Sequence, residues 1–188
     1  MRIRAILSLL AALGASACGE SPTDTTPAET SFTYEYRLGA ETTWRAFESR
    51  GQQPPGTELS VRGEWVHTLA DNLYAFMLAQ QRLPSGTWVT FATQVPLLAE
   101  GTTVDIIPAS EMCPSGRRCV SSSFNLESSD GSVEICRFTE GSYVLTRSTD
   151  AWLSATFSGR GTCTRSGVQQ PFEARNGEFD VQLPQRPA

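Results

Sequence analysis

Apolar and polar residues alternate one by one along several short stretches of this chain, a pattern that predicts β-strands. In the stretch 31–38 every second residue is apolar: Phe32, Tyr34, Tyr36 and Leu38. The same alternation recurs in three further stretches: 58–67, 120–127 and 152–158. Strands with one apolar and one polar face belong to antiparallel sheets that water wets on one side. We therefore expect an all-β fold, a single antiparallel β-sandwich or barrel-like domain.

Short segments of turn-forming residues separate the alternating stretches, at the spacing of a meander or sandwich. They are Ser129–Gly131, Glu140–Gly141, Ser148–Asp150 and Asn176–Gly177. Asn-Gly is the strongest hairpin signal, because a type I′ turn needs a positive φ at both central residues. We expect a two-residue turn at Asn176–Gly177 that pairs Ala174 with Phe179.

One stretch, 68–83, fits either a helix or a strand, because it contains good helix formers with apolar residues at helical spacing. It is followed by Pro84, Ser85 and Gly86, which form a suitable tight turn, and then by a second strand-like stretch. We therefore expect residues 73–83 and 87–95 to form a long hairpin, with a helix as the alternative.

Four cysteines, an even number, lie in the second half of the chain and suit disulfide bonds in an oxidising compartment. Of the three possible connectivities, we expect Cys113–Cys119 with Cys136–Cys163. The first pair encloses a short loop with proline and glycine, and the second pair lies in two strand-like runs that can be neighbours. A zinc site is the alternative, but the chain has no C-x₂-C pair and a single histidine, so we expect no metal.

The N-terminus has the pattern of a secretory signal peptide, which we expect over residues 1–17. Two of the first four residues are arginine, and an apolar run of ten residues follows at 5–14. That run is too short for the helix of about 20 residues that crosses a bilayer. Residues 19–30 contain no large apolar side chain and are rich in threonine, proline and acidic residues, which predicts a flexible tether.

Ala15-Ser16-Ala17 followed by Cys18 resembles the lipobox of bacterial lipoproteins, in which the cysteine is lipidated and becomes the new N-terminus. The chain as a whole resembles the many small bacterial lipoproteins in which a signal peptide, a lipidated cysteine and a tether precede one β-sandwich domain. This resemblance implies a lipid on Cys18. It also implies the outer membrane, because the aspartate that retains such proteins in the inner membrane is absent. Cleavage by ordinary signal peptidase, giving a secreted or periplasmic protein, is the alternative.

The rest of the chain, 31–188, suits a single domain after the tether at 18–30. All 15 basic residues are arginine and 20 residues are acidic, a formal charge of −5, or −7 once Arg2 and Arg4 are removed with the signal peptide. An acidic surface disfavours nucleic acid as a partner. The expected partners are the membrane, through the lipid, and a glycan or a protein. We expect no cofactor.

No catalytic motif is present, and a Ser-His-Asp or Cys-His device would have to use His67, which falls on the apolar side of its strand. We therefore expect a non-catalytic binding or structural module. The alternatives are a small envelope hydrolase with a carboxylate pair, and an assembly subunit or inhibitor that uses an edge strand.

Two tryptophans are the candidate binding residues. Trp152 falls on the polar side of its strand, opposite Leu153, and Trp88 is likewise out of phase with its apolar neighbours. An exposed indole beside hydroxyl groups could stack on a sugar or contact a protein, although a loop or a second sheet could equally cover it. Arg117–Arg118, inside the expected cysteine loop, could engage an anion or remain solvated.

Overall fold

The computed structural model describes residues 29–51, 59–67 and 73–185, with the backbone alone at positions 67 and 73. Within these ranges the chain forms eleven strands and no helix, which confirms the all-β prediction, and no helix there could cross a membrane. The strands are β1 (Ser31–Leu38), β2 (Arg45–Arg50), β3 (Leu59–His67), β4 (Leu73–Arg82), β5 (Trp88–Pro96), β6 (Thr103–Ile106), β7 (Cys119–Val120), β8 (Ser122–Glu127), β9 (Val133–Ser148), β10 (Trp152–Arg165) and β11 (Val168–Gln182).

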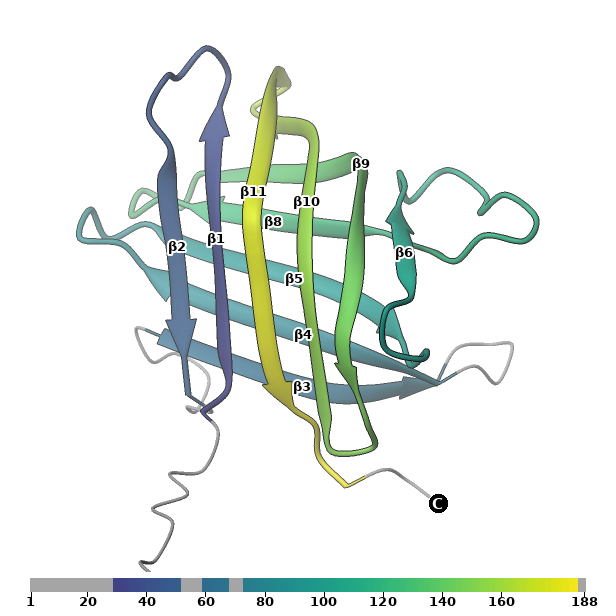
Figure 1. Ribbon diagram of the computed structural model, residues 1–188. Helices are drawn as coiled ribbons and strands as arrows, with labels where there is room; N and C mark the ends of the chain where they lie inside the picture. The colour runs from purple at the N-terminus through teal and green to yellow at the C-terminus, as the bar shows by residue number, and fades with distance from the viewer. Residues whose placement is uncertain (1–28, 52–58, 68–72, 186–188) are drawn as a thin grey trace, which may run out of the picture.

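All strands belong to one sheet in the order β2-β1-β11-β10-β9-β8-β5-β4-β3, and β6 pairs with β9 and with the short β7. In Figure 1, β2, β1, β11, β10 and β6 form a front layer, and β8, β5, β4 and β3 run crosswise behind it. The two edge strands come close to each other: the Val61 N–H donates to the Gly51 carbonyl at 3.1 Å, and the Ser49 hydroxyl donates to the Ser60 carbonyl at 2.9 Å. The sheet is thus nearly closed, as a barrel with orthogonal layers.

Strand β9 connects the two layers. Its residues 133–137 pair with β8 in the rear layer and its residues 141–144 pair with β6 in the front layer (Figure 1). At the bend, Gly141 lies opposite Gly159 of β10. A Cβ atom at Gly159 would lie 2.8 Å from the ring of Phe138, closer than packing allows. Glycine is therefore required where the sheet turns this corner.

The prediction of a two-residue turn at Asn176–Gly177 is wrong. Strand β11 continues through both residues, and Ala174 lies opposite Gly159 rather than Phe179. Asn176 has a φ of 50°, and the pairing of β11 with both neighbouring strands shifts register beside it, as in a β-bulge. A bulge and a type I′ turn both require positive φ, so asparagine serves either.

The two-residue turn of this region lies instead at Ser166–Gly167, where both φ values are positive and the flanking residues of β10 and β11 pair. The prediction that Glu140–Gly141 separates two strands is also wrong. Strand β9 runs through both residues, and Gly141 takes a φ of 147° within the strand. By contrast, Ser129–Gly131 and Ser148–Asp150 lie at the β8–β9 and β9–β10 connections, as predicted.

The hairpin predicted from the ambiguous stretch is confirmed, and the helix alternative is wrong. Strands β4 and β5 pair from Tyr74–Pro96 to Arg82–Trp88. The turn between them is closed by a hydrogen bond from the Leu83 N–H to the Thr87 carbonyl at 2.8 Å, and Gly86 has a φ of 82°.

Aromatic rings fill the space between the layers. The largest fully buried rings are Tyr36, Tyr143, Phe32, Phe47, Phe91, Phe124, Phe138, Phe172 and Phe179. Every apolar residue predicted to face inward from the stretch 31–38 is buried. The alternation expected over 58–67 fails at the start of β3, where Leu59 is 40% exposed and Ser60 is buried at the barrel seam. The Ser60 carbonyl there accepts a hydrogen bond from the Ser49 hydroxyl.

Both disulfides join the cysteines that the spacing predicts. Cys136 and Cys163 lie opposite each other on β9 and β10, fully buried, with their Cα atoms 3.8 Å apart. Cys113 and Cys119 close the loop that leads from β6 to β7, with a Cα–Cα distance of 5.5 Å. The Cys136–Cys163 bond therefore cross-links two strands in the core, and the Cys113–Cys119 bond closes a surface loop.

Candidate functional site

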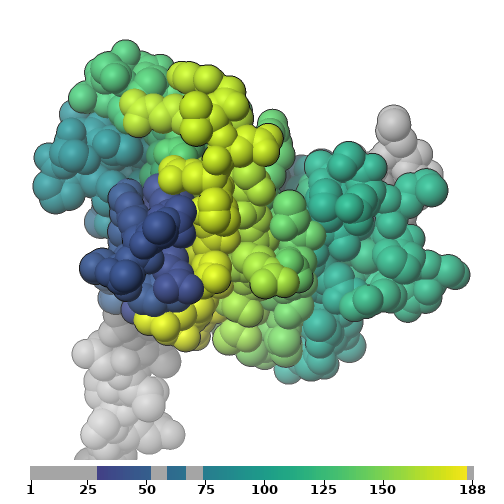
Figure 2. Space-filling view, turned by 90° about the horizontal axis from the view of Figure 1, so that it is seen from above, coloured from purple at the N-terminus to yellow at the C-terminus, as the bar shows by residue number. Residues whose placement is uncertain are grey.

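Three adjoining depressions, of about 350, 380 and 500 Å³, form a continuous surface channel that we call the outer groove. The depression of about 380 Å³ lies in the middle. It shares Glu140 and Gly141 with the depression of about 350 Å³, and Ser158 and Arg175 with the depression of about 500 Å³. The groove crosses the outward faces of β9, β10 and β11. In Figure 2 the segment that carries β6 and the Cys113–Cys119 loop, in teal, projects on one side of these green and yellow strands.

The floor of the groove consists of small residues: Gly141, Ser142, Ser158, Gly159, Ala174 and Gly177. Several of them cannot be larger, because the strands bend here and approach other atoms closely. A Cβ atom at Gly141 would lie 2.4 Å from the Ser158 carbonyl oxygen, and one at Gly177 would lie 2.4 Å from the Phe157 ring. At the corner of the barrel, small residues therefore lie between the larger side chains that line the channel, such as Trp44 and Arg160.

A row of alternating charges runs along the groove, one residue from each of four neighbouring strands. Glu140 of β9 lies opposite Arg160 of β10, which lies opposite Glu173 of β11, which lies opposite Arg37 of β1. Arg160 forms an ion pair with Glu140, and Arg37 binds the Glu173 carboxylate at 2.6 Å. We call these four residues the charged row.

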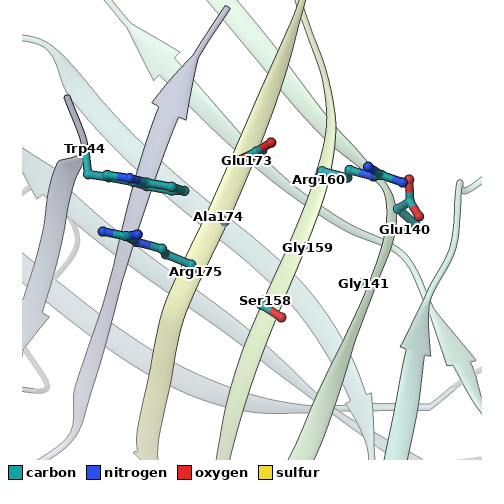
Figure 3. A pocket seen from close by; sticks show the side chains of 9 residues that line it. All are labelled: Trp44, Glu140, Gly141, Ser158, Gly159, Arg160, Glu173, Ala174 and Arg175. Atoms are coloured by element: carbon teal, nitrogen blue, oxygen red, sulfur yellow. The ribbon is translucent and has the colours of Figure 1, made fainter. Parts of the chain in front are cut away.

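Trp44, immediately before β2, ends the row and forms one wall of the groove (Figure 3). The guanidinium carbon of Arg175 lies 3.9 Å from the centre of the indole ring, and that of Arg37 lies 4.8 Å from it. Arg175 also binds Glu35 at 2.7 Å, and the Asn176 side-chain amide donates to the same carboxylate at 2.9 Å. These contacts hold the indole in a fixed position beside the channel.

The opposite wall is formed by β6 and the Cys113–Cys119 loop. Arg117 binds the carboxylate of Asp105 at 2.5 Å, and the Asp105 N–H donates to the Arg118 carbonyl at 2.7 Å. Of the arginine pair considered as an anion site, Arg117 is thus already paired with a carboxylate, whereas the Arg118 side chain is exposed.

Two carboxylates, Glu140 in the groove and Glu35 beside it, are held in their charged form. Hydrogen bonds from Arg160 lower the pKa of Glu140, and hydrogen bonds from Arg175 and Asn176 lower the pKa of Glu35. Arg160 in turn has a raised pKa because Glu140 accepts its hydrogen bond. The groove therefore presents permanent acceptors beside permanent donors. In the part of the chain that the structure describes, no group of three or more His, Cys, Asp and Glu side chains could hold a metal ion.

The two tryptophans chosen from the sequence do not line the outer groove. Both are half-buried on the outward side of their strands, Trp152 with the guanidinium of Arg147 at 5.0 Å and Trp88 with that of Arg82 at 5.8 Å. The polar side of the Trp152 strand nevertheless reaches the groove, through Thr156 and Ser158. Cys18 and the His67 side chain lie outside the described residues.

Sequence reasoning missed Trp44 and Arg175. The stretch 45–50, which forms β2, was not recognised as a strand, so nothing placed Trp44 beside β1. One signal was available: if 45–50 pairs with 31–38 as a hairpin, Trp44 falls next to Arg37 on the polar side. Arg175 was placed in a hairpin that does not exist, since β11 is continuous.

No family model, no curated protein and no solved structure matches this chain.

Proposed function

We propose that the protein is a lipid-anchored, non-catalytic binding module of the bacterial cell envelope that holds its ligand in the outer groove. The observation that carries this proposal is the groove itself: a channel across β9, β10 and β11 with β6 at one wall, lined by charged hydrogen-bonding side chains and bounded by an indole. A concave surface with a few convergent polar groups is the usual form of a ligand site.

The position of the groove fits an anchored protein. The chain enters the barrel at Thr30, whose hydroxyl accepts a hydrogen bond from the Gln182 N–H at 3.2 Å. Arg37, beside Trp44, lies six residues beyond Ser31 along β1, about 20 Å away at ~3.3 Å per residue. The Trp44 end of the groove is therefore remote from the point where the chain enters the barrel, whereas the depression at Glu178, opposite Thr33, lies nearer to it.

The lowered pKa values of Glu140 and Glu35 argue against either carboxyl group acting as the general acid of a hydrolase. A glycosidase needs one carboxyl group with a raised pKa to act as the general acid. Glu140 and Glu35 have lowered pKa values, so both stay ionised and accept hydrogen bonds. Such side chains orient a ligand without donating a proton to it.

The anchor is tested by expressing the full-length chain in a Gram-negative host and measuring the mass of the mature N-terminus. We expect a chain that begins at an acylated Cys18 and sediments with the outer membrane, and a Cys18→Ala variant in the soluble fraction. An unmodified Cys18, or a start further along the chain, would exclude the lipid anchor. Release of reducing ends from cell-wall glycans by the purified protein would exclude the non-catalytic role.

A further inference from the structure

We infer that the ligand of the outer groove is an uncharged oligosaccharide chain lying across the strands from Trp44 to Arg117. This inference rests on the proposed function, because it names the ligand class for the same groove. It follows from the length of the channel, its balance of charge, its hydrogen-bonding groups and its lack of a free strand edge.

The length of the groove suits a chain of several units. It extends over the outward faces of β6, β9, β10 and β11 to the indole beside β1. Neighbouring strands lie ~4.8 Å apart, so these four steps span about 19 Å. The floor of glycine, serine and alanine leaves a smooth path along this line. A single small molecule would fill only one of the three depressions.

The charges along the groove cancel in pairs. The ion pairs are Glu140–Arg160, Arg37–Glu173, Glu35–Arg175 and Asp105–Arg117. An anionic polymer would meet one carboxylate for every guanidinium, and Glu178 at one end adds a further negative charge. A cationic chain would meet the four guanidinium groups. An uncharged ligand avoids both repulsions.

Hydroxyl groups match the alternation of the charged row. Each hydroxyl donates one hydrogen bond and accepts others, so a sugar can donate to Glu140 or Glu173 and accept from Arg160 or Arg37 at the same time. Hydrogen bonds to ionised partners are stronger than neutral ones. The side chains of the Glu140–Arg160 pair are 56% and 65% exposed, so inserting a hydroxyl between them opposes only a weak, solvent-screened attraction.

Trp44 supplies apolar surface at this end of the groove, through the part of the indole that the Arg175 and Arg37 guanidinium groups leave uncovered. The C–H face of a sugar ring packs on aromatic side chains, while its hydroxyls point outward to polar groups. Because Arg175 and Arg37 contact the indole, the ring is already fixed before a ligand arrives, which reduces the entropy lost on binding.

An extended peptide is a poorer match for the groove. Peptides that bind to sheets add a strand to a free edge, where backbone groups are unpaired. The floor strands β10 and β11 are paired on both sides, β10 with β9 and β11, and β11 with β10 and β1. Along β10 and β11 the groove therefore presents side chains to a ligand and no strand edge.

The test is titration calorimetry on the lipidated protein in a non-glycosidic detergent, with maltotetraose, cellotetraose, chitotetraose and the acidic tetragalacturonate as probes. We expect at least one neutral tetrasaccharide to bind, its single sugar to bind at least about tenfold more weakly, and tetragalacturonate not to bind. Trp44→Ala should weaken binding of that tetrasaccharide about tenfold, the effect of losing one stacked ring. Trp88→Ala, at a half-buried indole outside the groove with an arginine of its own, should leave it unchanged.

The charged row is tested with matched ion-pair deletions. Glu140→Ala with Arg160→Ala removes one pair from the groove without changing the net charge, and should weaken binding several-fold. Glu48→Ala with Arg50→Ala removes an exposed pair on β2 outside the groove and should have no effect. Equal affinity in the Trp44→Ala variant, or no binding of any neutral probe, would overturn the inference. Binding of tetragalacturonate that requires Trp44 would also overturn it, but would leave the proposed binding function intact.

Discussion

Removing the buried disulfide should destabilise the domain more than removing the exposed one. The Cys136–Cys163 bond spans 27 residues and the Cys113–Cys119 bond spans 6. If a disulfide stabilises by restricting the unfolded chain, loops of these lengths correspond to about 3.5 and 2 kcal/mol of unfolding free energy. Replacing Cys136 and Cys163 by alanine also removes two fully buried sulfur atoms from the core, which adds to the larger loss.

Equilibrium unfolding in urea measures both losses, provided that the slope of the free energy against urea is the same for each variant. In thermal unfolding, 1 kcal/mol corresponds to about 2–4 °C for a domain of this size. We therefore expect Tm to fall by about 7–14 °C without the buried bond and by about 4–8 °C without the exposed one. The reduced wild-type protein provides the control, because it loses the cross-links while keeping the sulfur atoms.

Two results would refute this reasoning. An equal or larger loss on removing Cys113–Cys119 would show that loop length does not determine the stabilisation, for example because β9 and β10 already associate in the unfolded chain. Non-reducing peptide mapping that joined Cys119 to Cys136 would contradict the strand arrangement itself.

Four further substitutions make three predictions about the barrel. Gly161→Ala should lower the free energy of unfolding by about 3 kcal/mol, because the new Cβ atom would lie 2.0 Å from the Arg137 carbonyl oxygen. Gly131→Ala is the matched control: its Cβ atom would meet open space, so only the φ of 79° opposes it, and the same urea assay should show a loss of only about 1 kcal/mol. Tyr143 loses its proton only near pH 12 in the folded protein, because burial raises its pKa above the value of about 10 of an unfolded chain. The stability that this residue contributes is complete below pH 10 and is lost as the pH rises toward 12, so Tyr143→Phe should flatten the alkaline fall in Tm. Trp152→Ala should cost about 1–2 kcal/mol for a half-buried indole, and a loss of 3–5 kcal/mol would place Trp152 in the core.

Alternation of residues predicts most of the fold because it reflects a strong physical requirement. A strand buried on one face must present an apolar residue at every second position, and the stretch 31–38 does so without exception. The hairpin around Pro84–Gly86 was likewise predictable, since its turn residues and its flanking strands agree. Strand β2 was missed because only two of its six residues, Phe47 and Ser49, are buried, and one of these is polar.

The failures at Asn176–Gly177 and Glu140–Gly141 have a common cause. Glycine and asparagine indicate that the backbone takes a positive φ or comes close to other atoms, but not whether the chain then reverses or continues. The outcome depends on the neighbouring strands: β10 runs alongside both β9 and β11, so both continue past their glycines with a local shift of register. That information is absent from any single stretch of sequence.

The same bends explain why the candidate site has no sequence motif. The outer groove lies where Gly141, Gly159 and Gly177 allow three strands to approach other atoms closely at the corner of the barrel. Its charged row takes one residue from each of four strands, so Glu140 and Arg37 are in one row although 103 positions separate them. A site of this kind is defined by register, and a shift of one residue in the pairing of β10 with β11 would move Arg160 away from Glu173. The register shifts next to Asn176 and at Thr139 therefore set the strand pairing that brings the four residues of the charged row together.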